Sequence, residues 1–142
     1  MIPEKIPTRE DIERLQASIA NEPQVEIQTR HYFADGMYCR EVARRKDTLI
    51  VGKVHKKEHF YVVLQGEVTI VGEGKRERIK APRIMVSQPG TKRAVYAHED
   101  SVCMTVHRTF ETDLEVIEQE LVEEDPNAVF LPGNILKDKA LT

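Results

Sequence analysis

Residues 53–66 read KVHKKEHFYVVLQG, and the interpretation of the whole chain starts from this stretch. It places His55 and His59 on either side of the short segment KKE, continues as a run of aromatic and branched residues, and ends at Gly66. Such a run, closed by a glycine, predicts a β-strand that ends in a turn. The short KKE connection predicts a hairpin, at whose mouth the two histidines approach each other.

Similar short runs continue on both sides of this stretch, from about residue 25 to residue 108. They are rich in Val, Ile, Thr, Tyr and Phe, and turn-like segments such as ADG, GEGK and QPGTK separate them. The predicted strands cover residues 25–33, 37–43, 48–55, 59–65, 67–71, 76–81, 83–88, 93–97 and 101–109. Eight or nine short strands without a helix between them predict an all-β fold, an antiparallel sandwich or barrel.

A helix is predicted before the strands, over residues 8–20, TREDIERLQASIA. Thr8 can cap its first turn together with Asp11, three residues further on. Ile12, Leu15 and Ile19 then share one face of the helix. The segment NEP that follows ends the helix, because the residue before a proline avoids the helical region.

A second helix is predicted after the strands, within the acidic segment 111–125, ETDLEVIEQELVEED. Thr112 and Glu115 have the spacing of a capping box, and Leu114, Ile117 and Leu121 form an apolar stripe. The remaining tail is predicted to be irregular and to pack on the barrel or on a second subunit through Val129, Phe130, Leu131, Ile135 and Leu136. The expected organisation is therefore a helical extension over 1–24, a β-barrel over 25–109, and an acidic helix with a tail over 110–142.

Composition and charge narrow the class of protein. The chain has 142 residues, of which 40% are hydrophobic and 32% are charged, as expected for one soluble globular domain. It has no apolar run of the ~18–20 residues that cross a bilayer and no apolar signal-peptide core, so we expect a cytoplasmic protein without a membrane partner. Two cysteines, Cys39 and Cys103, lie in strand-like runs and are expected to be buried thiols.

The net charge of −3 is unevenly distributed along the chain. Residues 40–93 contain fourteen Lys and Arg against six Asp and Glu, whereas residues 111–125 contain eight acids and no base. This asymmetry fits solvated surface charges, and it also fits an anionic ligand. The basic residues are scattered and lack a stacking aromatic motif, which argues against nucleic-acid binding.

The strand-rich middle of the chain, roughly residues 30–108, resembles the cupin superfamily of small jelly rolls. The first motif of that family runs Gly, five residues, His-x-His, three or four residues, Glu, six residues, Gly. Gly66 matches the closing glycine, and counting back places His59 at the glutamate position and His55 at the second histidine. Lys53 then stands at the first histidine position and Asp47 at the opening glycine.

The second motif of the family is matched in QPGTKRAVYA by Pro89, displaced by one residue, and by Gly90. Arg93 stands at its histidine position and Ala97 at its asparagine position. The resemblance implies a small antiparallel jelly-roll barrel with short N- and C-terminal helices. The strings GKVHK and PGTKRAVYAHED also resemble small cupin-like proteins of tailed bacteriophages. That likeness implies a location in the host cytoplasm or the virion, and a phage or host protein as partner.

A metal site is the first functional interpretation. Two imidazoles on a rigid sheet suit Zn, Fe, Mn or Ni, and a working site needs a third ligand. His107 has the strand parity to reach the barrel interior, and Glu58 would have to be turned inward. Two histidines with a carboxylate would form the triad of non-haem iron oxygenases. Against a metal stand Lys53 and Arg93, because a cation at a ligand position repels a metal ion.

A second interpretation needs no metal. Lys53, Arg93 and also Arg40 would hold a phosphate or carboxylate, with Tyr61 or Tyr96 assisting. One of the two hairpin histidines would then act as acid or base on an anionic sugar or nucleotide, as in the metal-free sugar-nucleotide epimerases of the superfamily. The competing structural role for Arg93 is an ion pair with Glu58 or Asp100 at the barrel rim.

A third interpretation is a non-catalytic assembly or host-interaction module, with the terminal helices as contacts. The cupin resemblance separately implies a homodimer or another homo-oligomer, formed through sheet edges or the apolar tail. The sequence thus predicts His55, His59 and His107 as metal ligands and Lys53, Tyr61 and Arg93 as contacts to a small molecule or anion. It assigns no catalytic residue and no substrate.

Overall fold

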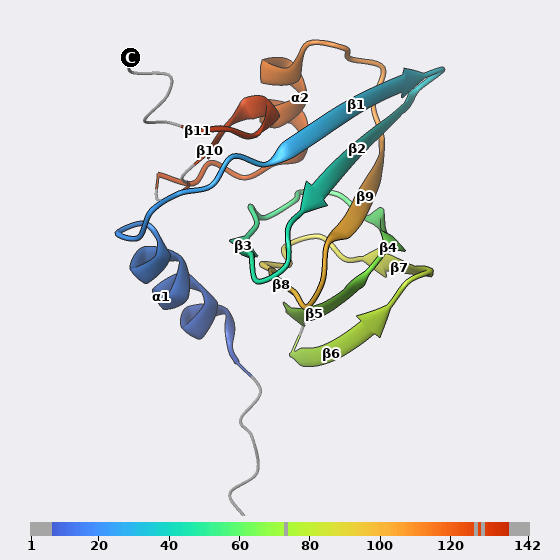
Figure 1. Ribbon diagram of the computed structural model, residues 1–142. Coiled ribbons are helices and arrows are strands. Elements are labelled where there is room, and N and C mark those ends of the chain that lie inside the picture. The colour runs from blue at the N-terminus through green and yellow to red at the C-terminus, as the bar shows by residue number, and fades with distance from the viewer. Residues whose placement is uncertain (1–6, 73, 127, 129, 137–142) are drawn as a thin grey trace, which may run out of the picture.

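The computed structural model describes residues 7–72, 74–126, 128 and 130–136 (Figure 1). The larger of its two main antiparallel sheets contains, in order, β1 (Gln28–Ala34), β2 (Met37–Arg44), β9 (Ser101–Arg108), β4 (His59–Gln65) and β7 (Arg83–Ser87). The smaller sheet contains β3 (Leu49–Val51), β8 (Ala94–Ala97), β5 (Glu67–Gly72) and β6 (Lys75–Lys80). The chain changes sheets between β3 and β4 and again between β4 and β5, as in a jelly roll. The predicted hairpin across residues 56–58 is therefore wrong, because β3 pairs with β8 and β4 pairs with β7 and β9. The predicted all-β jelly roll with short terminal helices is confirmed.

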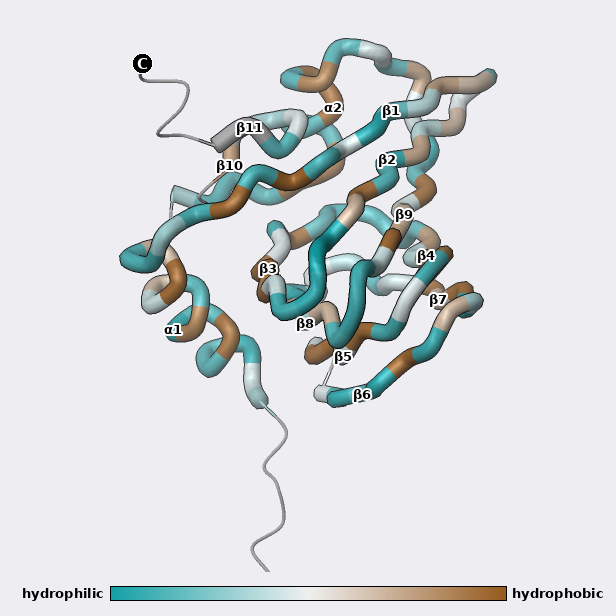
Figure 2. The backbone as a smooth tube through the Cα atoms, in the orientation of Figure 1, coloured by the Kyte–Doolittle hydropathy of each residue, from teal (hydrophilic) through white to brown (hydrophobic). Residues whose placement is uncertain are grey.

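The interior between the sheets is filled by alternate residues of the strands, because successive side chains of a strand point to opposite faces. In β9 the residues Ser101, Cys103, Thr105 and His107 are buried, and those between them are less so. Figure 2 shows the resulting mixture of hydrophobic and hydrophilic positions along the strands. The apolar core joins both sheets through Tyr61, Val63, Val68, Ile70, Ile79, Val95 and Cys103. Burying a branched or aromatic side chain of this kind contributes about 1.5–3 kcal/mol.

Two turns use left-handed backbone at the positions of the family's first motif. Gly66, between β4 and β5, has φ +83°, and a Cβ there would lie 2.3 Å from Ser101 Oγ. Only glycine fits this position. Asp47, at the opening-glycine position, has φ +67° and accepts a hydrogen bond from the hydroxyl of Tyr96 at 2.6 Å. Aspartate tolerates this region because its short polar side chain bonds locally, so the turn is kept without a glycine.

The N-terminal helix α1 (Arg9–Ile19) agrees with its prediction. Thr8 accepts from the Asp11 amide at 3.2 Å, and the Asp11 carboxylate accepts from the Thr8 amide at 2.8 Å. Both halves of the capping box are therefore present. Ile12 is buried, and Leu15 and Ile19 on the same face are half-buried. Thr8 and Ile12 thus fix where this helix begins and which face it buries.

The C-terminal helix α2 (Leu114–Leu121) differs from its prediction at both ends. Its cap is Asp113, whose carboxylate accepts from the amides of Glu115 and Val116, so the predicted Thr112–Glu115 capping box is wrong. A carboxylate is a strong cap because it satisfies orphan amides and complements the helix dipole. The helix ends at Leu121, where the chain extends to pair with His55.

The apolar stripe of α2 packs against the jelly roll as predicted. Ile117 and Leu121 are buried with Tyr38 of β2, and Leu114 packs against them. The tail contains the short strands β10 (Phe130–Leu131) and β11 (Ile135–Leu136) around a 3₁₀ turn, η1 (Pro132–Asn134), where an irregular segment was predicted. The predicted contacts of Val129 lie outside the described residues, as do those of the Leu131, Ile135 and Leu136 side chains.

Cys103 is buried and Cys39 is half-buried, and both thiols are free. No helix within the described parts of the chain is long and apolar enough to cross a membrane.

Candidate metal centre

Three histidines from separate segments meet in the interior. His55 follows β3, His59 begins β4, and His107 lies near the end of β9. One ring nitrogen from each lies within 4.8 Å of the others. The ring centroids are 4.4 Å apart for His55 and His59, 4.6 Å for His59 and His107, and 5.1 Å for His55 and His107. The three residues predicted as metal ligands are thus brought together, and their role as ligands stays a prediction.

Neighbouring groups orient these rings. The Nδ1 of His59 is 3.0 Å from the backbone oxygen of Lys57, so Nδ1–H donates and Nε2 carries the lone pair. The Nε2 of His107 is 2.8 Å from Thr105 Oγ1, two residues earlier on the same face of β9. The backbone of His55 is tied to Val122 by a β-bridge and accepts from the Gly90 amide at 2.9 Å. Local contacts therefore orient the rings of His59 and His107, and the end of α2 fixes the backbone of His55.

The electrostatic surroundings keep two of the imidazoles neutral. Burial, followed by the charge of Arg40, lowers the pKa of His55 from 6.5 to about 2. Burial, followed by His59 and Arg40, lowers the pKa of His107 to about 3. Burial acts in this direction because a low-dielectric interior disfavours the charged form. At neutral pH both rings therefore offer a lone pair without first losing a proton, which is the state that metal coordination requires.

Among the residues that the structure describes, no carboxylate joins this group. Glu58 is exposed in the turn between β3 and β4, and the third member of the cluster is the imidazole of His107. Glu58 has the orientation that strand parity predicted, pointing away from His59. The two-histidine, one-carboxylate triad considered from the sequence is therefore replaced by three imidazoles. Such a set suits Zn, Cu, Fe or Ni and leaves coordination positions for water or substrate.

Lys53 is not an unmatched cation at a ligand position. Its ammonium forms an ion pair with the carboxylate of Glu118, which α2 brings across the end of the jelly roll. Both side chains are largely buried, with about a fifth to a quarter of their area exposed. The repulsion that Lys53 was expected to exert on a metal ion is therefore offset by Glu118.

Arg93 lies in the interior, where it contacts Tyr61. Its guanidinium carbon is 4.5 Å from the centroid of the Tyr61 ring, and its Nη2 donates to Ser87 Oγ at 2.7 Å. Ser87 is the register partner of His59, so this contact places the guanidinium near the histidines. Asp100, one of the predicted rim partners of Arg93, instead accepts from the Lys46 amide. Burial raises the pKa of Tyr61 to about 12, so its hydroxyl stays neutral.

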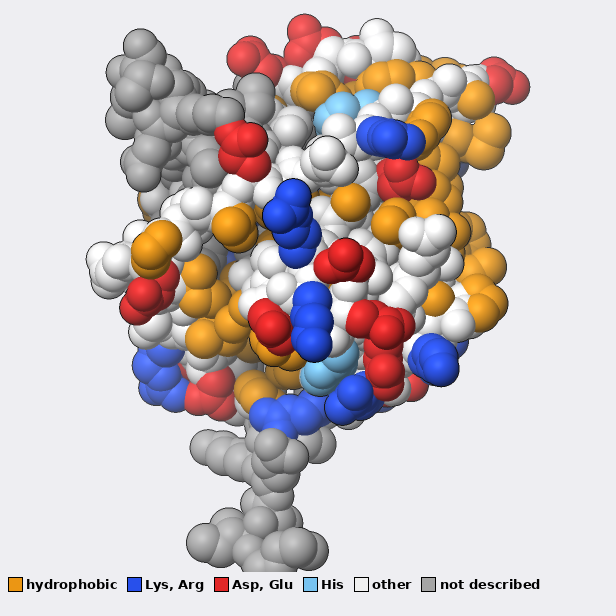
Figure 3. Space-filling view, viewed as in Figure 1, with side chains coloured by type: hydrophobic (Ala, Val, Ile, Leu, Met, Phe, Trp, Pro, Cys, Tyr) orange, Lys and Arg blue, Asp and Glu red, His pale blue; other side chains and the backbone are white. Residues whose placement is uncertain are grey.

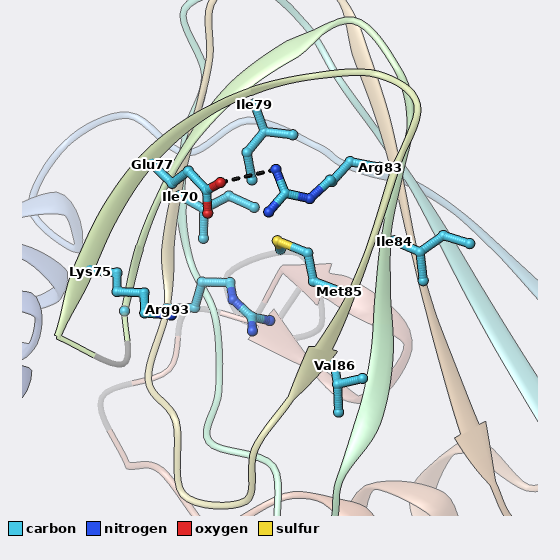
Figure 4. A pocket seen from close by; sticks show the side chains of 10 residues that line it. Ile70, Lys75, Glu77, Ile79, Arg83, Ile84, Met85, Val86 and Arg93 are labelled. Carbon is cyan, nitrogen blue, oxygen red and sulfur yellow. Dashed lines mark ion pairs between the residues drawn. The ribbon is translucent and has the colours of Figure 1, made fainter.

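Two cavities adjoin this region. Figure 4 shows the first, of about 210 Å³, where Arg93 and Met85 line the interior and Glu77 pairs with Arg83 at 2.9 Å. The second, of about 70 Å³, lies beneath α2 and is lined by His55, Lys53, Glu118, Arg40 and Arg44. It is the cavity that reaches the histidine cluster directly.

Arg44 is the residue of this site that the sequence interpretation did not single out. It occupies the same face of β2 as Tyr38, Arg40 and Val42, of which Tyr38 and Val42 are buried. The parity of those two apolar residues was the available signal, because it assigns both arginines to the interior.

The other histidines and Tyr96 have partners elsewhere. His31 Nδ1 is 2.7 Å from the Tyr38 hydroxyl, and His98 Nε2 is 2.6 Å from Thr69 Oγ1. Tyr96 donates to Asp47, on the smaller sheet. Tyr96 therefore does not join the cluster in the role that the sequence suggested for it.

Comparison with known proteins identifies the fold. No protein-family model matches the chain, and no curated protein sequence does. Among solved structures, KdgF from a Halomonas species is similar with a TM-score of 0.54 and 16% identity, over 64% of this chain and 87% of that one. A cupin superfamily protein from Desulfitobacterium hafniense has a TM-score of 0.52 and 10% identity, over 77% and 99% of the two chains. A predicted oxalate decarboxylase from Thermotoga maritima has a TM-score of 0.51 and 15% identity, over 59% and 81%.

These similarities show the cupin jelly-roll fold, as the sequence motifs implied. At such low identity they carry no ligand or activity to this chain. The resemblance to bacteriophage proteins stays a prediction.

Proposed function

We propose that this chain is a small cupin-like binding protein whose interior holds a divalent metal ion on His55, His59 and His107. The observation that carries the proposal is the convergence of three ring nitrogens within 4.8 Å of one another. Metal–nitrogen bonds of about 2.0–2.1 Å place ligand nitrogens roughly 3–3.5 Å apart in tetrahedral or octahedral geometry. Small side-chain rotations would therefore close the site around an ion.

The ion would be Zn, Cu, Fe or Ni, which imidazole ligands suit. Mn, also considered from the sequence, prefers oxygen ligands, which this histidine cluster does not include. Three protein ligands leave at least one position for a small molecule, where the metal would act as a Lewis acid. Arg93 and Tyr61 are placed to contact such a ligand, and Lys53 borders the cavity beside His55. No residue of this chain is assigned a catalytic step.

The metal-free acid–base alternative has less support from the site. A general base works best with a pKa near the working pH. Burial and neighbouring charges instead lower the pKa of His55, one of the two candidate acid–base residues, to about 2, and that of the adjacent His107 to about 3, so neither ring readily takes a proton at neutral pH. A neutral imidazole of this kind is better suited to binding a metal.

Metal content measured by mass spectrometry on untagged protein tests the proposal. Wild-type protein should carry close to one metal ion per chain, and His55→Ala/His59→Ala should carry none while remaining folded. His98→Ala is the matched control, because His98 bonds to Thr69 and lies outside the cluster. An absence of metal from wild-type protein even after reconstitution would reject the proposal.

We also propose that the protein forms a homodimer through the outer face of the larger sheet. One row across this face, in register, consists of Cys39, Val106, Phe60 and Val86. Exposed fractions of 69% for Ile84 and 50% for Phe60 are high for large apolar side chains. Figure 3 shows hydrophobic side chains gathered along the right-hand edge of the molecule.

Contiguous apolar patches on soluble proteins mark interaction sites, and most oligomers are symmetric. An uncharged row of this kind can pack against its own copy without leaving a charge unpaired. A phage or host protein on the same face is the alternative occupant, in line with the non-catalytic assembly role. A cytoplasmic or virion location stays a prediction.

A further inference from the structure

Arg40 and Arg44 bring two guanidinium groups into the interior of the jelly roll. Both lie on the inward face of β2, whose other inward residues, Tyr38 and Val42, are buried. Both line the cavity of about 70 Å³ beneath α2, together with Lys53 and His55. Guanidinium groups stay charged at any physiological pH, so this cavity carries fixed positive charge.

The charge of the two arginines is not matched by carboxylates. Glu118, the acid that lines the cavity, pairs with Lys53, and its charge also acts on Arg40, so one carboxylate faces three cations. Among the residues that the structure describes, neither Arg40 nor Arg44 has an ion pair.

Three of the six guanidinium nitrogens are also buried without a hydrogen-bond partner. Nε of Arg40 and both Nε and Nη1 of Arg44 are buried without a hydrogen-bond acceptor. Arg44 also forms side-chain hydrogen bonds with Tyr61 and Cys103. The Tyr61 hydroxyl is neutral, because burial raises its pKa to about 12, so it does not balance the charge of Arg44. Buried donors and buried charges of this kind are unfavourable unless a partner is supplied, and each calls for a physical explanation.

We infer that a small oxyanion binds in this cavity, between Arg40 and Arg44. The planar guanidinium fork matches two oxygens of a carboxylate, sulfate or phosphate group. A cavity of about 70 Å³ has room for several waters, because one water needs roughly 10–15 Å³ of such volume. It therefore admits an anion of a few heavy atoms and excludes the sugar nucleotide considered from the sequence.

The anion site is placed to act together with the metal centre. His55 lines the same cavity as Arg40, and Arg40 is the charge that most affects this imidazole. A divalent ion on the histidines would add positive charge beside Arg40, and an oxyanion between them would offset it. Metal and anion should therefore raise each other's affinity by the same factor. This coupling rests on the proposed metal site, whereas anion binding by the arginines does not.

Calorimetric titration of chelator-treated protein with oxalate and, separately, with sodium sulfate tests the inference at constant ionic strength. Wild-type protein should bind at least one of them with one site, and the preferred probe identifies a carboxylate or a tetrahedral oxyanion as the natural ligand class. Arg40→Met and Arg44→Met should each weaken binding at least tenfold. Arg78→Met is the matched control, because Arg78 is exposed on β6 and pairs with Glu67. Its affinity should equal that of wild type.

Thermal unfolding without anion gives a second readout that a structural role would not produce. Removing an unmatched buried charge should leave the melting temperature of Arg40→Met and Arg44→Met unchanged or higher. The inference is overturned if wild-type protein neither binds the two probes nor melts at a higher temperature in their presence. It is also overturned if the control weakens equally, or if the two variants unfold while Arg78→Met remains folded.

A final experiment distinguishes the proposed metal centre from the proposed anion site between Arg40 and Arg44. Sulfate is the probe, because it is a weak zinc chelator. Wild-type protein loaded with zinc should bind sulfate more tightly than metal-free protein does. Sulfate binding that persists when no zinc can be loaded supports the arginine site and rejects the metal centre. Zinc binding without any response to sulfate or oxalate rejects the arginine site and leaves the metal centre standing.

Discussion

Acid should destabilise the metal-free protein through two of its buried histidines, His55 and His107. Their pKa values in the folded protein are about 2 and about 3, whereas an unfolded chain has the ordinary value of 6.5. Below pH 6.5 the two histidines therefore bind protons in the unfolded state but not in the folded state. Above about pH 6.5 these two histidines do not lower the free energy of unfolding. Below it, they lower the free energy of unfolding progressively as the pH falls toward 3.

The magnitude follows from the distance between the pH and the unfolded pKa. At pH 4.5, two units below the unfolded pKa, protonation of each imidazole favours the unfolded state by a little under 3 kcal/mol, at about 1.36 kcal/mol per pH unit. The two histidines together should cost about 5 kcal/mol relative to pH 7.5. That is a large part of the roughly 5–15 kcal/mol by which a domain of this kind is stable.

Urea unfolding of chelator-treated protein at pH 7.5, 5.5 and 4.5 measures this loss. Carboxylates also titrate in this range, so the comparison is with His55→Gln/His107→Gln, which keeps the carboxylates and removes the two imidazoles. The wild-type free energy of unfolding should fall by about 5 kcal/mol more than that of the double variant. Parallel pH curves for the two proteins would refute the account of buried, neutral histidines.

Three further perturbations test other parts of the structure. Gly66→Ala should destabilise the protein by more than about 2 kcal/mol, because the new Cβ would lie 2.3 Å from Ser101 Oγ. Gly74→Ala should lower the stability by only about 1–2 kcal/mol, the cost of placing alanine in left-handed backbone, since nothing lies within 4 Å of its Cβ. Equal losses of stability for the two variants in urea unfolding would contradict the steric argument. Ile84→Lys and Phe60→Lys should turn a wild-type dimer into monomers in sedimentation velocity, and a monomeric wild-type protein at high micromolar concentration would reject the proposed interface. Zinc binding at pH 7.5 should release almost no protons, as measured by calorimetry in buffers of different ionisation enthalpy, and release of a full proton or more would show that the site is protonated before binding.

Local signals in the sequence were enough where the deciding residues are neighbours along the chain. Strand β4 coincides with its predicted range, 59–65, because a branched and aromatic run ends at a position with left-handed backbone that only glycine can occupy. Helix α1 begins where Thr8 and Asp11 cap each other. The alternation of β9 placed His107 toward the interior, where it meets His55 and His59.

The predictions from local sequence were wrong or incomplete where the structure depends on contacts between residues far apart in the chain. Residues 48–55 were predicted as one strand, but β3 ends at Val51, and His55 pairs instead with Val122 beyond α2. No sequence pattern near His55 indicates that its partner is Val122. The ion pair that matches Lys53 comes from Glu118, which local sequence cannot place either. Arg44 was missed because hydrophilic residues are expected on the surface, although Tyr38 and Val42 share its parity.

The location of a metal ion tests the central claim most directly. Crystals of protein grown with zinc, measured on both sides of the zinc absorption edge, would show the ion as an anomalous difference peak. The account predicts one dominant peak at bonding distance, about 2.0–2.1 Å, from a ring nitrogen of each of His55, His59 and His107. A peak bound elsewhere on the chain, with the three histidines uncoordinated, would contradict it.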